Sequence, residues 1–251
     1  MNLEQQLDAA EDHRLAGQYD KAKTHYQSLI TEKNKFDITY AHALRGLAEV
    51  NRMLENYSDS KTFYDQAIES YQQLNHNIGL GHAYLGQGQL HRHQHDIDSA
   101  ETAINRALNY FDLSGNQYGN ADAHIELGHI FFSQGQLPDS VETFTKAFKK
   151  YDALKDVWGA ASSMLGLGKV KNKMQNFDAA KEALLDAKKL FESINDKLGQ
   201  ANVNKELGFL YKETNDKARA KSHYFDAKTF YDEMQESSQS QRCVEEIIDL
   251  E

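Results

Sequence analysis

The chain has 251 residues, of which 40% are hydrophobic and 26% charged, and its formal net charge is −10. This length suffices for a sizeable soluble fold, whereas the negative charge argues against nucleic acid as the partner, because phosphate binding needs a cationic surface. The single cysteine, Cys243, excludes an intrachain disulfide framework.

The sequence favours a soluble, cytoplasmic protein. Its first residues, MNLEQQLDAAEDH, contain neither a basic leader nor an apolar core, so no secretory signal is expected. No run of about eighteen apolar residues occurs, and no membrane insertion is therefore predicted. Only one proline, Pro138, interrupts the chain, and no flexible linker divides it, so residues 1–251 are expected to form one domain.

The chain begins with a degenerate helix pair over residues 3–36. Leu3 and Leu7 are spaced for one face of a helix that covers residues 3–15. Gly17 marks the break before the partner helix. A terminal unit of this kind is commonly atypical because one of its faces meets water.

From residue 41 onwards the sequence repeats every forty residues. Four glycines keep this step, and each is expected in the turn that ends its unit: Gly79, Gly119, Gly159 and Gly199. Self-similarity at such a period is typical of arrays of helix pairs. The period predicts five further pairs, at residues 41–78, 81–118, 121–158, 161–198 and 201–238. Pro138 supports this register, since it would begin a second helix, where its missing N–H costs nothing.

Small residues recur where the helices of each pair are expected to meet. The eighth position of the first helix is always small: Ala48, Gly88, Gly128, Gly168 and Gly208. Glycine inside a helix costs about 1 kcal/mol relative to alanine, so its recurrence indicates close helix contact. The second helices carry large side chains that are expected to pack over these sites: Tyr64, Ile104, Phe144, Leu184 and Tyr224.

This pattern resembles the tetratricopeptide repeat. The resemblance rests on Leu or Gln followed by Gly or Ala in the first helix, as in Leu47-Ala48 and Leu207-Gly208, and on the small and large positions of the second helix. The forty-residue step is similar to that of spindle-orienting adaptors and bacterial peptide-sensing regulators. The resemblance covers nearly the whole chain and implies an all-α fold, an α-solenoid of about six helix-turn-helix repeats in a right-handed superhelix.

The chain ends in an acidic amphipathic helix over residues 241–251. Cys243, Val244, Ile247 and Ile248 share one helical face, and acidic residues lie opposite. One interpretation is a helix that caps the last repeat. The other is a segment that occupies its own or a neighbour's groove, which makes self-association possible.

No residues are arranged for catalysis. A phosphate-binding glycine loop, a nucleophile motif and a zinc-ligand spacing are all missing from the sequence, which therefore predicts no enzyme, no cofactor and no metal site. His91 and His95 lie four residues apart, as two metal ligands on one helix face would. Because this histidine-rich run ends a helix, we interpret it as ordinary surface.

The family resemblance also implies where a ligand lies. In tetratricopeptide arrays the first helices line the concave groove, and ligand-facing positions are typically the second, fifth, ninth, twelfth and thirteenth of that helix. Carried over to this chain, these positions give the candidate binding residues Arg45, Arg52, Leu85, Arg92, Ile125, His129, Phe132, Leu165, Lys169, Lys173, Lys205, Phe209 and Lys212.

The ligand-facing positions hold seven cations but only three acids, Glu49, Asp122 and Glu213, so most other acids are expected on second helices and turns. The sequence thus predicts a scaffold or adaptor that binds an acidic, amphipathic segment of a protein or peptide partner. A bacterial-type sensor of a short signalling peptide is the alternative. A third interpretation is a solvated surface whose apolar residues pack between repeats.

One known specialisation of the family is not expected. The carboxylate clamp that holds chaperone C-termini uses Asn at a ninth position and at the sixth position of the next first helix. No ninth position here is Asn, and the sixth positions are Gly46, Gly86, Glu126, Gly166 and Glu206.

Overall fold

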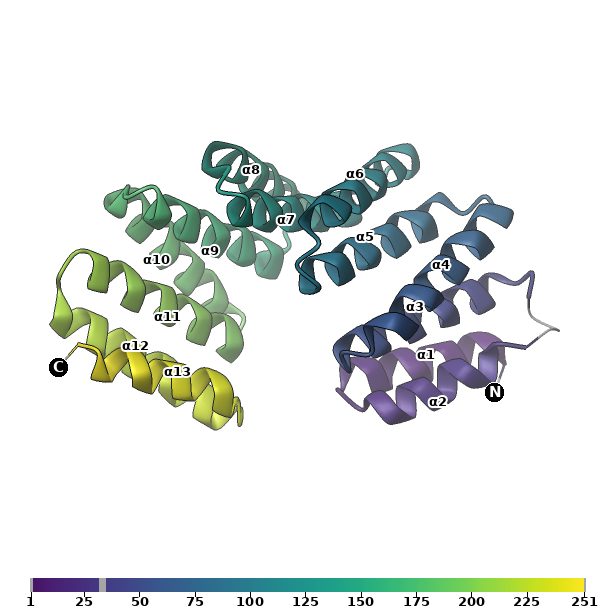
Figure 1. Ribbon diagram of the computed structural model, residues 1–251, viewed down its shortest axis with the longest axis horizontal. Helices are drawn as coiled ribbons and strands as arrows, with labels where there is room; N and C mark the ends of the chain where they lie inside the picture. Colours follow the sequence, from purple (N-terminus) through teal and green to yellow (C-terminus); the bar gives the residue numbers. More distant parts are fainter. Residues whose placement is uncertain (1, 32–34, 251) are drawn as a thin grey trace. The chain divides into compact units, whose positions relative to one another are not determined.

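The computed structural model describes residues 2–31 and 35–250, and within these ranges all the regular structure is α-helical. Apart from the connection between the second and third helices, the helices are joined in sequence by short turns (Figure 1). They are α1 (Leu3–Leu15), α2 (Tyr19–Leu29), α3 (Ile38–Met53), α4 (Tyr57–Gln73), α5 (Asn77–His93), α6 (Ile97–Ser114), α7 (Gln117–Ser133), α8 (Leu137–Leu154), α9 (Val157–Lys173), α10 (Phe177–Ser193), α11 (Lys197–Glu213), α12 (Lys217–Glu233) and α13 (Ser237–Ile248). The predicted all-α repeat fold is confirmed.

The helices form two compact units. Unit 1 is Met1–Glu126 and unit 2 is Leu127–Glu251, so that the boundary falls inside α7. Within each unit, a first helix packs against the second helix of its own pair and against the next pair. The single domain expected over residues 1–251 stays a prediction.

The first helices α5, α7, α9 and α11 begin four residues before the predicted unit boundaries, and α3 begins three residues before its own. In α11, Asp196 is the N-cap, and its side chain accepts a hydrogen bond of 3.0 Å from the backbone N–H of Gly199. Gly199 therefore lies in the first turn of a helix, and the prediction that it ends a unit was wrong. A Cβ at Gly199 would lie 2.2 Å from the ring of Phe191, so the glycine makes room for that aromatic side chain. The same aromatic contact is found at Gly79, Gly119 and Gly159.

From the end of α3 onwards the turns are built alike and recur every twenty residues. One residue in each has a positive φ: Glu55, Asn75, His95, Gly115, Gly135, Lys155, Gln175, Asn195, Asn215 and Gln235. Around Gln175, for example, the N–H groups of Gln175 and Asn176 donate to the carbonyls of Asn172 and Lys171, each at 2.9 Å. These bonds satisfy the last carbonyls of the helix. Most of these positions are not glycine, although a side chain disfavours this conformation.

Large side chains of the second helices pack over small residues of the first helices, as predicted. A Cβ at Gly88 would lie 2.4 Å from Cδ1 of Ile104, and one at Gly128 would lie 2.8 Å from the ring of Phe144. In the second pair the small residue of α4 adds a hydrogen bond, because the hydroxyl of Ser60 donates to the carbonyl of Ala48 at 2.8 Å.

The size of the residue at the sixth position of each first helix depends on the side chain that it meets in the preceding pair. Gly46, Gly86 and Gly166 lie against Tyr26, Tyr64 and Phe144, whose side chains come within 2.3–2.4 Å of where a Cβ would stand. Where the preceding second helix carries an aliphatic residue, Ile104 or Leu184, the sixth position is Glu126 or Glu206. A small sixth residue thus lets an aromatic ring reach the first-helix side of the array.

The two ends differ in how well they follow prediction. The helix expected over residues 3–15 is α1, while residues 32–34 of the expected first pair lie outside the described residues. At the other end, α13 begins at Ser237, four residues early, and Glu251 is not described. Pro138 lies in the first turn of α8, as predicted.

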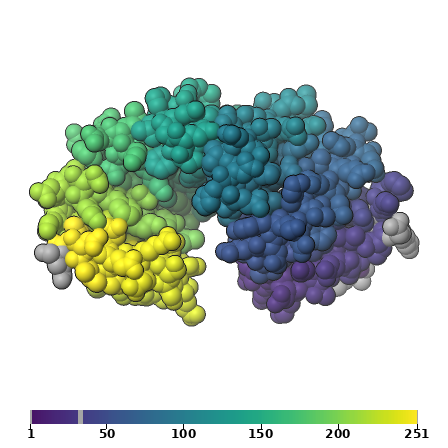
Figure 2. Space-filling model, viewed as in Figure 1, coloured from purple at the N-terminus to yellow at the C-terminus, as the bar shows by residue number. Residues whose placement is uncertain are grey.

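The C-terminal helix α13 packs against α12 and α11 at the surface of unit 2 (Figure 2, yellow). Cys243 is buried against Ala201, Ala227 and Tyr231. Ile248 is 59% exposed, so the expected apolar face of four residues does not all turn inward. Since α13 starts forty residues after α11, it lies where the first helix of another repeat would begin.

Candidate binding surface

All thirteen candidate binding residues lie on first helices, and we call this set the first-helix row. Unit 1 carries Arg45 and Arg52 on α3, Leu85 and Arg92 on α5, and Ile125 on α7. Unit 2 carries the remaining eight, namely His129, Phe132, Leu165, Lys169, Lys173, Lys205, Phe209 and Lys212. The structure therefore brings the row together as two sets, one in each unit.

The apolar members of the row differ in exposure. Leu85 is only 7% exposed and offers a ligand almost no surface, which is a correction to its predicted role. Ile125 and Phe132 are half-buried. Leu165 and Phe209 are also half-buried and pack against the core of unit 2, where the ring of Phe209 meets Tyr224 edge to face at 5.5 Å. These last two combine a fixed position with remaining apolar surface.

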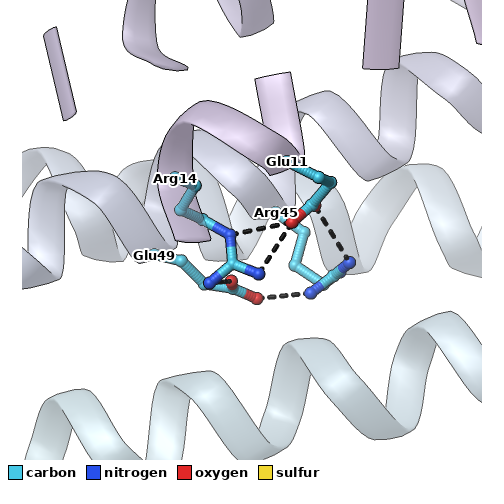
Figure 3. A network of polar contacts seen from close by, with 4 residues as sticks. All are labelled: Glu11, Arg14, Arg45 and Glu49. Atoms are coloured by element: carbon cyan, nitrogen blue, oxygen red, sulfur yellow. Dashed lines mark hydrogen bonds and ion pairs between the residues drawn. The ribbon is translucent and has the colours of Figure 1, made fainter. Parts of the chain in front are cut away.

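In unit 1, Arg45 belongs to a network of four charged residues (Figure 3). Arg14 of α1 lies 2.7 Å from Glu11 and 3.3 Å from Glu49 of α3. Arg45 pairs with Glu49 and lies 3.8 Å from Glu11. Burial alone would raise the pKa of Glu49, but the three nearby guanidiniums, those of Arg45, Arg14 and Arg52, hold it below its usual value. The network joins the first helix pair to the second by charge.

Acidic residues from neighbouring first helices pair with three further cations of the row. Arg92 Nε lies 2.9 Å from Glu126, Lys169 lies 3.2 Å from Glu206, and Lys212 lies 2.6 Å from Glu246. Glu126 and Glu206 are the sixth residues of the next first helix, and Glu246 has the corresponding place on α13. These acids lie outside the ligand-facing positions that were counted in the sequence. The positive charge of the row is therefore largely neutralised within the chain.

Two lysines of the first-helix row in unit 2 have no carboxylate within ion-pair distance among the described residues. Lys173 is exposed at the end of α9. Lys205 donates to the neutral side chain of Gln239 at 3.3 Å, and burial lowers its pKa. Lys205 and Phe209 also line a cleft between α11 and α13, together with Arg242 and Glu246. Positive charge and apolar surface thus meet in one part of unit 2.

Two histidines in unit 1 lie beside the charged network and stay neutral at neutral pH. Burial, reinforced by Arg45, lowers the pKa of His42 and of His82 to about 4. Neither therefore adds positive charge to the first-helix row near pH 7. The sequence predicted none of this, because the spacing of the histidines does not show how deeply each is buried.

Sequence reasoning also missed the sixth-position glutamates as partners of the row. The signal was available, since Arg92 and Glu126 are separated by 34 residues, as are Lys212 and Glu246. This spacing was not used, because the sixth positions were examined only for the asparagine of a carboxylate clamp.

The described residues show no other kind of site. They contain no group of three or more His, Cys, Asp or Glu side chains placed to hold a metal ion. None of their helices is both long and apolar enough to cross a membrane. His91 and His95, the pair considered for a metal, are separated by the end of α5 at His93, and His95 lies in the following turn.

Comparison with known families agrees with this geometry. Two sequence models, both described as tetratricopeptide repeat, match residues 39–113 and 83–153. The chain is a tetratricopeptide repeat protein. This family is typically non-enzymatic, and its fold supports a protein-interaction scaffold. No curated protein matches the sequence of this tetratricopeptide repeat protein.

Solved structures share the fold at low sequence identity. The chain matches a structure of the hetero-tetramer Cut9-Hcn1 of APC/C at 20% identity and a TM-score of 0.73, over 96% of its own length but only 42% of the other chain. A Rap protein complexed with Competence and Sporulation Factor matches at 16% identity and a TM-score of 0.71, over 96% of this chain and 72% of the Rap chain. BtubC from P. vanneervenii matches at 18% identity and a TM-score of 0.68, over 94% of this chain and 93% of the BtubC chain. Each likeness concerns the fold alone.

Proposed function

We propose that this tetratricopeptide repeat protein is a non-enzymatic adaptor that binds an acidic, amphipathic segment of another protein along its first-helix row. The observation that carries the proposal is in unit 2. Lys173 and Lys205 have no carboxylate partner among the described residues, and they share the row with the half-buried Leu165 and Phe209. Such a surface complements a helix or extended segment with acidic and apolar residues.

The two kinds of side chain have different tasks in this proposal. An exposed ion pair contributes only about 0.2–1 kcal/mol, whereas a micromolar complex needs about −8 kcal/mol. The lysines therefore orient the partner and speed its association. Most of the affinity must come from burial of apolar surface at Leu165 and Phe209, at about 25 cal/mol per Å².

The chain itself contains a helix of the proposed kind. Helix α13 is acidic and amphipathic, and it packs beside α11 with Glu246 2.6 Å and Asp249 3.8 Å from Lys212. Cys243 supplies the buried apolar contact. This intramolecular example supports the idea that first-helix lysines of unit 2 suit an acidic helix, and it also keeps self-association through α13 as a possible use of the same surface.

Selection from peptide libraries tests the proposal without knowledge of the partner. We expect random fifteen-residue peptides selected on the protein to become enriched in Asp and Glu together with Leu, Ile or Phe. A variant with Lys173→Glu and Lys205→Glu should lose this enrichment. The control is Lys149→Glu on α8, an exposed lysine outside the row, which should keep it. Enrichment of neutral or basic peptides would contradict the proposal.

A second candidate is a sensor of a short signalling peptide. It is favoured by the likeness to the Rap protein that was crystallised with Competence and Sporulation Factor. A parallel library of six-residue peptides separates the two candidates, because a sensor should select short sequences with affinities as high as those of the longer peptides. An adaptor for an amphipathic helix should gain affinity with length.

A further inference from the structure

Unit 1 has a cleft beside α6 that the first-helix row does not use. Its volume is about 660 Å³, and one residue of α5 and five of α6 line it: Tyr84, Thr102, Asn105, Arg106, Asn109 and Tyr110. A second cleft of about 310 Å³ shares Thr102 and Arg106 with the first and reaches Asp98 in the first turn of α6. We call the two together the α6 cleft.

One face of α6 supplies the polar side of the α6 cleft. Five exposed residues follow one another at steps of three or four, which places them on one stripe of the helix: Asp98, Thr102, Asn105, Arg106 and Asn109. A ligand in the cleft therefore meets these side chains in a fixed order along the helix, with a negative charge at one end and a positive charge farther on.

The positive charge of the stripe is held in place without being neutralised. The guanidinium carbon of Arg106 lies 5.5 Å from the centre of the Tyr84 ring. Tyr84 is itself fixed, because it is only 7% exposed and its ring lies parallel to that of Tyr110, with the ring centres 5.7 Å apart. No carboxylate of the described residues lies within ion-pair distance of Arg106. Arg106 thus offers a ligand a positioned cation.

The other members of the stripe are also available to a ligand. Asp98 has no cation within ion-pair distance among the described residues, with which the side chains of Thr102, Asn105 and Asn109 make no hydrogen bond. Each asparagine amide has donors and an acceptor, as a peptide group does. Asn105 and Asn109 are one helical turn apart, about 5–6 Å between Cβ atoms, close to the roughly 6.6 Å between alternate residues of an extended chain. The two amides therefore suit the backbone of an extended peptide.

The two charges specify which side chains such a peptide needs. Asp98 and Arg106 are eight residues apart on a helix that rises about 1.5 Å per residue, so about 12 Å separates them along α6. Residues i and i+4 of an extended chain point to the same side and are about 13 Å apart. One peptide can therefore reach Arg106 with an acidic residue and Asp98 with a basic residue when the two are four positions apart.

Packing of the repeats does not require this arrangement. The residues at the positions of Tyr84 and Arg106 are different in each of the other pairs from residue 41 onwards: Leu44 with Gln66, His124 with Lys146, Met164 with Asp186, and Asn204 with Asp226. Residues that hold the repeats together recur at each step of forty, as the small eighth positions do. The combination of a buried tyrosine with an exposed arginine is particular to α5 and α6.

We propose that the α6 cleft binds an extended peptide segment that carries an acidic and a basic residue four positions apart. Arg106 binds the acidic side chain and Asp98 the basic one, while Asn105 and Asn109 pair with peptide groups beside the acidic residue. The site goes beyond the proposed function, because it lies apart from the first-helix row and takes a segment of balanced charge.

Nuclear magnetic resonance of the full ¹⁵N-labelled chain tests the proposal through the side-chain amide signals of Asn105 and Asn109. The probe is acetyl-Ser-Glu-Thr-Thr-Thr-Lys-Ser-amide. Its control, acetyl-Ser-Thr-Glu-Lys-Thr-Thr-Ser-amide, has the same composition with the two charges adjacent. We expect saturable shifts of both amides with the probe, and binding of the control that is about threefold weaker because it can make only one of the two ion pairs. Equal affinities, or no saturable shift of these amides, would overturn the proposal.

Reversal of one charge in the protein separates recognition from folding. Arg106→Glu should bind the probe more weakly than the analogue in which lysine replaces the glutamate, and loss of structure cannot produce such a reversed preference. The matched control is Lys146→Glu on α8, an exposed lysine forty residues after Arg106, which should keep the preference of the wild type for the probe. An unchanged preference in Arg106→Glu would contradict the proposal.

A variant of the first-helix row separates this site from the proposed function. Lys173→Glu with Lys205→Glu should bind the probe as the wild type does, because both lysines lie on helices other than α6. If this variant loses the probe while Arg106→Glu keeps it, the probe binds on the first-helix row. The α6 site is then refuted, and the adaptor function stands.

Discussion

The fit between Phe144 and two glycines is the packing feature most open to a quantitative test. The ring is 1% exposed and lies between first helices of successive pairs. A Cβ at Gly128 would come within 2.8 Å of it, and one at Gly166 within 2.4 Å. Replacement of Gly166 by alanine therefore forces a buried ring to move.

Two opposing terms set the size of the effect. Alanine gains about 1 kcal/mol over glycine inside a helix, while overpacking of a core costs about 1–3 kcal/mol. We expect Gly166→Ala to lower the free energy of unfolding by about 1 kcal/mol despite its better helix propensity. Phe144→Leu alone should cost about 1–2 kcal/mol through the cavity that it leaves.

The double variant decides whether the contact is responsible. With Leu at 144 the new methyl group has room, as the pairing of Leu184 with Glu206 in the next repeat suggests. The two changes should then be less harmful together than their sum by at least about 1 kcal/mol. Urea unfolding followed by circular dichroism measures this, with hydrogen exchange in α9, because repeat arrays need not unfold in one step. Additivity within about 0.5 kcal/mol would refute the reasoning.

Three further predictions concern the network, the turns and the C-terminal helix. Glu49→Gln should lower the free energy of unfolding by about 2 kcal/mol, which is less than the roughly 3–5 kcal/mol lost when one partner of a fully buried ion pair is removed. Because the folded pKa of Glu49 is depressed, wild-type stability should be lost as the pH falls below about 5. The variant should lose less stability over the same pH range in the same urea titrations. An acid dependence identical in both proteins would contradict this. Gln175→Gly should raise the unfolding free energy by about 0.5–1 kcal/mol, because Gln175 has a φ of 60°, whereas a loss of stability would show that its side chain matters more. The buried thiol of Cys243, 1% exposed, should react with a thiol reagent far more slowly in the folded chain than in urea, and rapid reaction of the native protein would show that α13 detaches readily.

Much of the fold could be predicted from the sequence, because the signals for it are local and repeated. The forty-residue period, the small eighth positions and the large residues opposite them predicted helix pairs packed large against small, and the structure has them at Gly88 with Ile104 and Gly128 with Phe144. Errors arose where one residue type serves two structures. Gly199 was expected in a turn because glycine is common there, but a glycine beneath an aromatic ring has the same sequence signature.

Less of the candidate site could be predicted, because its properties depend on residues that are distant in sequence. Sequence position placed the thirteen residues on first helices, but Leu85 proved to be buried. The charge count was misleading in the same way, since Arg92 and Lys169 meet Glu126 and Glu206 of the next first helix.

The sequence by itself determined the class of fold, because helical periodicity and repeat length are properties of the chain that each unit expresses locally. Tertiary structure alone decided which charges are available to a partner. Lys173 and Lys205 lack a carboxylate partner among the described residues, whereas Arg45 is held by Glu49 and Glu11. Pairing depends on distances of a few ångströms between different helices, and the repeat pattern fixes which helices are neighbours without fixing those distances.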